Sequence, residues 1–226
     1  MKNLKFTITA LAIFLSLSSI AQVNTATIQT DGSQIRQTKG TSQPATGSMY
    51  INERYMPAQI TGYDNNVLVR YNAYSDYFEI NDTKTGQPET LSKNPEVEIT
   101  IVSTNQTYKV LEYKTEKGET HYGYLTVISE GPKVSLYKKE TIVLQPEFFP
   151  SNSYQSYKAA NYKKSDDEYY IKLDNEIVYL SSKSKHLAKM MPEQDKEIKT
   201  FIKKNKISLD KEQDLVKLAD YLQTIL

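Results

Sequence analysis

Apolar and polar positions alternate in short runs through the middle of the chain, and this pattern predicts strands over residues 49–181. The runs are rich in Val, Ile, Tyr and Thr and are separated by turn-forming residues, as is typical of antiparallel sheets. The clearest hairpin joins residues 67–72 to 77–80. A second hairpin is expected where Asp174-Asn175 separates two β-rich runs. We therefore expect an antiparallel sheet, either a sandwich or an open barrel-like domain.

Two stretches inside this domain carry further expectations. Residues 134–144 are predicted to form one long strand, the last of the first group. Residues 146–164 have no regular period, and Phe148-Phe149-Pro150 within them is expected to plug the core or to pack at a loop.

Residues 182–226 change to a helical pattern. Apolar residues recur three and four positions apart and form two stripes: Ile198, Phe201 and Ile202, then Leu215, Leu218, Leu222 and Ile225. Ser182 is expected to cap the first helix, and Pro192 to lie in the first turn of the second. Asp210 and Gln213 have the spacing of a capping box for the third. Strands followed by helices predict an α+β fold, with a small helical tail that packs on the β domain.

The N-terminus has the three parts of a secretory signal peptide. Lys2 and Lys5 are positive, residues 6–20 are uncharged and mostly apolar, and Ala21 is the small residue before a cleavage site. The apolar stretch is shorter than the roughly 20 residues that a membrane helix needs, which favours cleavage over a retained anchor. We expect residues 1–21 to direct export by the general secretory route. The mature protein is then expected in the periplasm, on the outer surface or outside the cell, without a transmembrane segment.

Residues 22–48 are rich in Thr, Gln, Ser and Gly and have few large apolar side chains. Such a composition buries too little surface to offset the entropy of ordering, so it predicts a flexible polar leader. Ile28 and Ile35 leave open a short edge strand within it.

Composition removes several classes of function. The chain of 226 residues has a formal charge of +1, which gives no electrostatic basis for nucleic-acid binding. The absence of Cys excludes disulfides, thiol catalysis and Cys-based metal sites. The 18 Tyr residues are expected mainly in the sheet, because Tyr favours strands and pairs across them. The alternative is a surface of Tyr rings on which sugars or peptides stack.

No stretch of the chain carries a catalytic motif. The two His residues, His121 and His186, form no paired metal motif, and neither a nucleophile elbow nor a Gly-rich phosphate loop is present. We therefore predict no catalytic residue, no metal ligand and no cofactor. A triad that uses His121, or a pair of carboxylates, stays open as an alternative. The candidate acids for such a pair include Asp76, Glu79, Glu98, Glu112 and Glu119.

The most distinctive internal string runs from residue 70 to residue 79, where aromatic and charged side chains are concentrated on one hairpin. If the tip of this hairpin is exposed, it predicts a recognition patch. The predicted binding residues are Arg70, Tyr71, Tyr74, Asp76 and Tyr77. The alternative is that cross-strand Tyr packing and a local ion pair stabilise the hairpin.

The string VLVRYNAYSDYFEI (residues 67–80), the tail over residues 169–222 and a signal peptide that ends in Ile-Ala-Gln resemble a group of secreted Bacteroidota proteins of uncharacterised function. This resemblance implies an exported, envelope-associated context and transfers no catalytic residue. The expected function is a non-enzymatic binding or structural role in the envelope, through contacts with a partner protein. The alternatives are a glycan- or small-ligand-binding module that uses exposed Tyr residues and a hydrolase that depends on carboxylates or His121.

Overall fold

The computed structural model describes residues 29–30, 33–34, 42–81, 87–152 and 154–226. The chain divides into two units, Met1–Thr41 and Ser42–Leu226. In the first unit, β1 (Gln29–Thr30) pairs antiparallel with β2 (Ser33–Gln34). The predicted signal peptide and both Ile28 and Ile35 lie outside the described residues. A search of the described residues finds no helix that is both long and apolar enough to cross a membrane.

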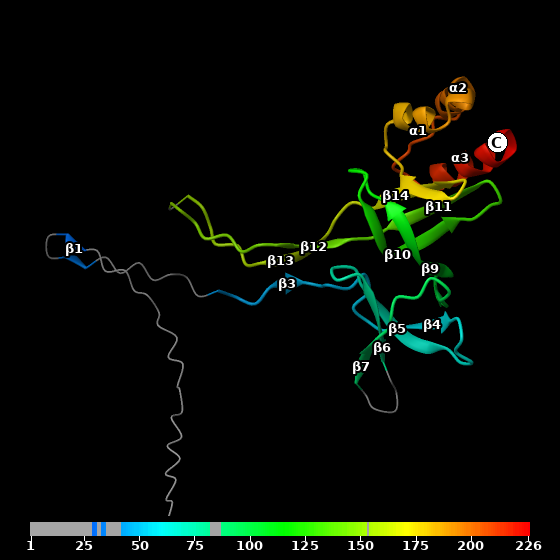
Figure 1. Cartoon of the computed structure of the whole chain (residues 1–226). Coiled ribbons are helices and arrows are strands. Elements are labelled where there is room, and N and C mark those ends of the chain that lie inside the picture. The colour runs from blue at the N-terminus through cyan, green and yellow to red at the C-terminus, as the bar shows by residue number, and fades with distance from the viewer. Residues whose placement is uncertain (1–28, 31–32, 35–41, 82–86, 153) are drawn as a thin grey trace, which may run out of the picture. The chain divides into compact units, whose positions relative to one another are not determined.

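The second unit is built on a ten-stranded sheet, visible in Figure 1. Its strands along the chain are β4 (Met56–Ile60), β5 (Val67–Asn72), β6 (Tyr77–Asn81), β7 (Pro88–Thr90), β8 (Glu98–Ile101), β9 (Gln106–Lys114), β10 (Thr120–Ser129), β11 (Val134–Lys139), β14 (Glu168–Leu173) and β15 (Glu176–Tyr179). Their order in the sheet is β10-β11-β14-β15-β9-β8-β4-β5-β6-β7. The predicted turn at Asp174 is confirmed, since this residue has φ 53° between β14 and β15.

Five of these strands close into a barrel, because β9 pairs with β10 along one edge and with β15 at Val178↔Lys114 on the other. One face of the barrel strands carries a cluster rich in tyrosine. Its buried members are Tyr113, Leu125, Tyr137, Tyr170 and Ile177. The predicted role of Tyr as a core residue of the sheet is thereby confirmed for much of the barrel.

The remaining strands extend from the first half of β9, where β8 pairs with it. Their core is a second aromatic cluster in which Tyr71 stacks on Phe78 at 4.9 Å between ring centroids. Phe78 also meets Tyr108 and Tyr124 edge-on. Such offset and edge-to-face pairs are the favoured arrangements of aromatic rings. Strands β5 and β6 are therefore fixed against β9 and β10 by packed rings.

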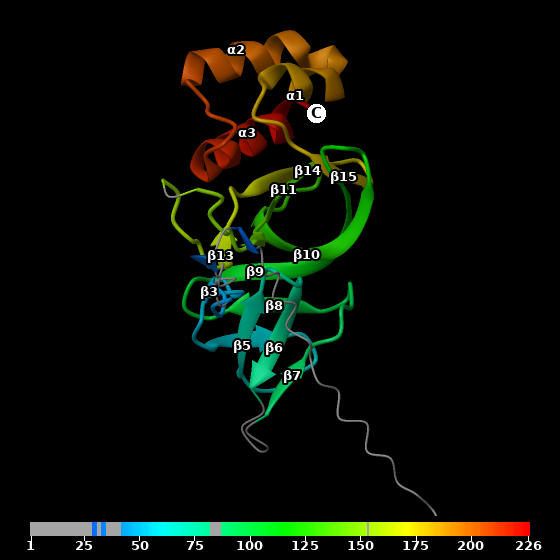
Figure 2. The same ribbon diagram turned by 90° about the vertical axis from the view of Figure 1, so that its left-hand side faces the viewer.

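Three helices follow the strands: α1 (Ser184–Met190), α2 (Asp195–Asn205) and α3 (Glu212–Ile225), with a 3-10 turn η1 (Pro192–Gln194) before α2. Figure 2 shows them together beside β11 and β14. Leu215, Leu218 and Leu222 of α3 are buried in one cluster with Leu136 of β11 and Ile171 of β14. The predicted α+β fold, a β-sheet domain with a helical C-terminal segment, is confirmed.

The predicted caps of these helices are wrong. Lys183 and Lys211 stand at the N-caps of α1 and α3, and neither helix has a side-chain capping bond. Asp210 accepts a hydrogen bond from the Ser208 hydroxyl instead of capping α3. Ser and Asp side chains bond locally in turns as readily as they cap, and spacing alone does not decide between the two outcomes.

The predicted long strand at residues 134–144 is divided in two. β11 ends at Lys139, and β12 (Ile142–Gln145) pairs with β13 (Asn161–Lys164) in a separate three-stranded sheet. The third strand of this sheet is β3 (Thr46–Gly47), which lies within the predicted leader. Between the two strands lies Glu140, a buried residue that accepts hydrogen bonds from Tyr108 and Lys164. We call residues 142–164 the arm; Figure 1 shows β3 beside β13 and the hairpin beyond them extending away from the ten-stranded sheet and the helices.

Candidate functional site

The predicted recognition patch centres on the β5–β6 hairpin, and one of its acids is Glu79. The Glu79 carboxylate pairs with Arg70, with Nε and Nη2 each at 2.7 Å from Oε2. It also accepts hydrogen bonds from the hydroxyls of Tyr50 at 2.7 Å, Tyr55 at 3.1 Å and Tyr77 at 3.3 Å. The Arg70 guanidinium lies over the Tyr50 and Tyr55 rings, at 3.8 and 4.5 Å from their centroids. The polar groups of this cluster are therefore occupied by one another.

Asp76 forms the centre of a second cluster, which joins the hairpin turn to the barrel. Its Oδ1 accepts hydrogen bonds from Lys139 Nζ at 2.5 Å, from the Tyr71 hydroxyl at 2.6 Å and from the Tyr124 amide at 3.3 Å. Its Oδ2 pairs with Lys93 Nζ at 2.5 Å. Lys139 Nζ also donates hydrogen bonds to the Tyr71 hydroxyl and the Tyr124 carbonyl, each at 3.1 Å. A buried lysine on β11 thus has three partners.

These contacts move several pKa values. Burial raises the pKa of Asp76, but the charge of Lys139 and the hydrogen bonds to the carboxylate outweigh it and leave the pKa below its ordinary value. At Glu79, burial again raises the pKa, and the bonds from Tyr50 and Arg70 lower it further than burial raises it. Burial, with the bond to Glu79, raises the pKa of Tyr50 to about 12. Both carboxylates are therefore held in the charged form and the phenol in the neutral form at neutral pH.

The five predicted binding residues have different surroundings. Tyr71 is buried, while Arg70 and Asp76 have side chains 23% and 24% exposed and engaged as described. Tyr77 is half-buried and shares the Glu79 cluster. Tyr74, with 44% of its surface exposed, has the most accessible ring. The structure accounts for four of the five by contacts that stabilise the hairpin, and their role in recognition stays a prediction.

Tyr74 connects the hairpin to the arm. Its ring meets the Tyr162 ring of β13 edge-on, with centroids 5.1 Å apart. The neighbouring Ala73 carbonyl accepts a hydrogen bond from the Ile142 amide at the start of β12. The turn between β5 and β6 therefore supports the root of the arm and places an exposed ring there.

The arm carries large apolar side chains in solvent. Every described residue from 143 to 158 is exposed or only partly buried. Residue 153 lies outside the described residues. The exposed apolar side chains of the arm are Val143, Leu144, Phe148, Phe149 and Tyr154. Of the two expected positions for Phe148 and Phe149, the core is wrong: they are 41% and 37% exposed and belong to none of the three core clusters. Packing at a loop is confirmed for Phe149, whose ring lies 5.2 Å from that of Tyr157. The exposure of Phe148 and Phe149 could not be predicted from sequence, because paired aromatics are usual in cores.

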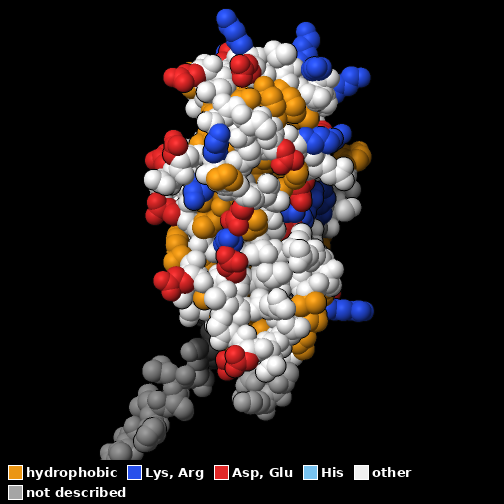
Figure 3. Space-filling model, turned by 90° about the vertical axis from the view of Figure 1, so that its right-hand side faces the viewer, with side chains coloured by type: hydrophobic (Ala, Val, Ile, Leu, Met, Phe, Trp, Pro, Cys, Tyr) orange, Lys and Arg blue, Asp and Glu red, His pale blue; other side chains and the backbone are white. Residues whose placement is uncertain are grey.

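The face seen from the side away from the arm has a different character. Figure 3 shows acidic and basic side chains interspersed there with small apolar patches. A mixed surface of this kind is ordinary for a near-neutral protein. Among the described residues, the arm carries five of the ten large apolar side chains that are exposed.

The residues that sequence offered for hydrolysis are either engaged by internal partners or exposed, as are Glu112, Glu119 and His121. His121 is half exposed, and its nearest carboxylate is Glu119 at 3.7 Å. Asp76 and Glu79 are engaged as described, and Glu98 pairs with Lys109 at 2.8 Å. Among the residues that the structure describes, no group of three or more His, Cys, Asp or Glu side chains is placed to hold a metal ion.

The exposed tyrosines lie on separate elements. They are Tyr63 after β4, Tyr74 after β5, Tyr122 on β10 and Tyr154 in the arm. The glycan-binding alternative, which needs several exposed tyrosines on one concave surface, stays a prediction. Comparison of the chain with family models, with curated proteins and with solved structures gives no match.

Proposed function

We propose that this chain is an exported, non-enzymatic binding protein of the cell envelope, and that it contacts a partner protein through the arm. The observation that carries this proposal is the set of aliphatic and aromatic side chains held in solvent on residues 143–154. Burial of these side chains against a partner would be favourable, because it removes apolar surface from water. A group of exposed apolar side chains of this kind therefore marks an interaction surface.

The chemistry of the arm favours a protein over a small ligand. Aromatic residues are enriched where protein interfaces are fully buried. Val143 and Leu144 are adjacent on one strand and therefore face opposite sides of the arm, so a partner must wrap or flank it. β12 is also a terminal strand of its sheet as described, with one edge available for main-chain pairing.

Export rests on the sequence of the N-terminus. The positive start, the uncharged apolar run and the small residue Ala21 support cleavage before Gln22. A non-enzymatic role rests on the absence of a catalytic motif and on the engagement of Asp76 and Glu79 by internal partners. Mass spectrometry of the protein recovered from the envelope fraction tests export; an intact Met1 would overturn it.

The binding proposal is tested by photo-crosslinking in the source cells. A photoreactive residue is placed at Phe148 on the arm and, as a matched control of similar exposure, at Tyr122 on β10. The proposal expects one reproducible protein adduct from position 148 and none of that mass from position 122. Equal adducts from both positions, or none from position 148, would contradict it; an adduct with twice the mass of the chain would identify a second copy as the partner.

A further inference from the structure

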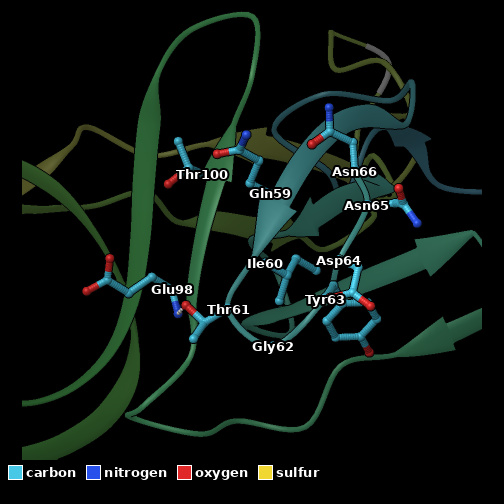
Figure 4. Close-up of a pocket in the computed structure, with 10 residues that line it drawn as sticks. All are labelled: Gln59, Ile60, Thr61, Gly62, Tyr63, Asp64, Asn65, Asn66, Glu98 and Thr100. Atoms are coloured by element: carbon cyan, nitrogen blue, oxygen red, sulfur yellow. Dashed lines mark hydrogen bonds between the residues drawn. The ribbon is translucent and has the colours of Figure 1, made fainter.

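A hollow of about 390 Å³ lies at the end of the sheet where β4 turns into β5, and Figure 4 shows its lining. The volume is at the small end of the range for ligand sites. The lining consists of Gln59, Ile60, Thr61, Gly62, Tyr63, Asp64, Asn65, Asn66, Glu98 and Thr100. Eight of these side chains are polar or aromatic with a polar tip, and none is basic.

The hollow stands on a fixed frame. Gln59 of β4 is paired with Thr100 of β8. The Thr61 amide donates to the Glu98 carbonyl at 3.1 Å, and the Glu98 amide donates back to the Thr61 hydroxyl at 3.1 Å. Gly62 adopts φ 86°, which lets the chain turn tightly after β4 at no steric cost. Two strands and one closed turn therefore hold residues 59–63, 98 and 100 of the lining in place, and residues 64–66 lie on the loop that leads to β5.

The polar groups of this hollow fall into two sets. Glu98 pairs with Lys109, and Thr100 shares a hydrogen bond of 3.0 Å with Thr107. In contrast, five side chains make no hydrogen bond or ion pair with any residue that the structure describes. They are Gln59, Tyr63, Asp64, Asn65 and Asn66. Five side chains with free donors and acceptors around one hollow are available to a ligand.

We propose that this hollow binds a neutral saccharide. An amide side chain presents a donor and an acceptor together, which matches neighbouring sugar hydroxyls, and three amides line the site. The Tyr63 ring, 49% exposed, offers a flat face to the C–H side of a sugar ring. Asp64 accepts hydroxyl donors and, with no basic side chain in the lining, repels acidic sugars.

This site differs from the glycan surface expected from sequence, because it uses one tyrosine and a set of amides in place of several tyrosines. It is also independent of the proposed contact through the arm, since none of its lining residues belongs to residues 142–164. An arm variant with Val143→Ser and Leu144→Ser is therefore expected to keep saccharide binding.

The test is saturation-transfer NMR on the purified mature protein with a panel of neutral mono- and disaccharides of glucose, galactose, mannose and N-acetylglucosamine. Glucuronic and galacturonic acids complete the panel. The proposal expects transfer to at least one neutral sugar and weak or absent transfer to the acids. Tyr63→Ala and Asn66→Ala should each weaken binding of that sugar by about tenfold, which corresponds to about 1.4 kcal/mol.

Tyr122→Ala is the matched control, because Tyr122 is 47% exposed and lies outside the hollow. It should leave the affinity unchanged. Absence of transfer to every neutral sugar, preference for the acidic sugars, or equal losses in Tyr63→Ala and Tyr122→Ala would each overturn the proposal. The saccharide measurement does not depend on whether the arm forms a crosslink. Failure of one proposal therefore leaves the other standing.

Discussion

The β5–β6 hairpin and the arm differ in where their side chains find partners. On the hairpin, Asp76 and Glu79 are each surrounded by donors from the same molecule. On the arm, Phe148 and Tyr154 remain in solvent, with 41% and 97% of their surfaces exposed. A high density of aromatic and charged residues therefore does not by itself mark a recognition site. What matters is how many of those groups the protein already satisfies.

The comparison is also energetic. A hydrogen-bonded charge such as Lys139 is costly to leave without its partner, because the desolvation cost remains when the attraction is lost. Removal of an exposed apolar side chain from the arm leaves no buried group without its partner, so it should change stability little. Substitutions in the hairpin should therefore lower the free energy of unfolding, whereas substitutions in the arm should lower the affinity for the partner.

The largest effect is expected from Asp76→Ala. It leaves Lys139, whose side chain is 9% exposed, without its carboxylate and should lower the free energy of unfolding by about 3 kcal/mol or more. Urea denaturation at neutral pH measures this loss. Asp64→Ala is the control, since this exposed acid makes no internal ion pair among the described residues; it should stay within about 0.5 kcal/mol of the native protein.

A smaller loss is expected from Gly123→Ala. A Cβ at this position would collide with Asp76 Oδ2, which pairs with Lys93, while Lys139 holds the other oxygen of the same carboxylate. Overpacking of this kind costs about 1–3 kcal/mol. In the background of Asp76→Ala the same substitution should cost much less, because the colliding atom is gone. Equal costs in both backgrounds would show that Asp76 does not occupy the position described here.

Much of this contrast between the hairpin and the arm could not be predicted from the sequence. Strands β5 and β6 and the stripe formed by Leu215, Leu218 and Leu222 could be predicted, because each follows from a local pattern of apolar residues. The barrel could not, since its closure depends on one parallel bridge between Val178 and Lys114 far along the chain. The arm was hidden because β11 and β12 read as one continuous run.

The candidate site was predictable to the same limited degree. Residues 70–79 were found because their composition is distinctive, yet composition does not reveal that Lys139 reaches Asp76 from β11. Equally, no local pattern distinguishes Asn66, whose side chain has no hydrogen-bond partner among the described residues, from the many polar residues of the sheet that have one. Partners brought from distant strands decide both outcomes.

Acidification should erode the hairpin's contribution. The folded pKa values of Asp76 and Glu79 lie below their unfolded values of 3.8 and 4.5, so their stabilisation is complete above the unfolded pKa and is lost as the pH falls through the folded pKa. The native protein should therefore lose stability from about pH 5 downward. Glu79→Gln should have a lower free energy of unfolding than the native protein at neutral pH, and the gap between the two values should narrow in acid. A constant difference across this range would contradict the assignment.

The smallest effect on stability is expected in the arm. Val143→Ser with Leu144→Ser replaces two exposed side chains and should change the free energy of unfolding by no more than about 0.5 kcal/mol. Val102→Ser, at another exposed apolar position, is the matched control. A loss of several kcal/mol in the arm variant would mean that these side chains are buried within the protein and would remove the contrast with the hairpin.

The central claim is that the arm binds and the hairpin stabilises, and one affinity measurement tests it most directly. The partner identified by crosslinking at position 148 is titrated against the native protein and against the Val143→Ser, Leu144→Ser variant, with Glu79→Gln as the comparison. The account predicts that the arm variant loses at least about tenfold in affinity, or about 1.4 kcal/mol, while folded Glu79→Gln keeps native affinity. Native affinity in the arm variant together with a loss in Glu79→Gln would contradict it.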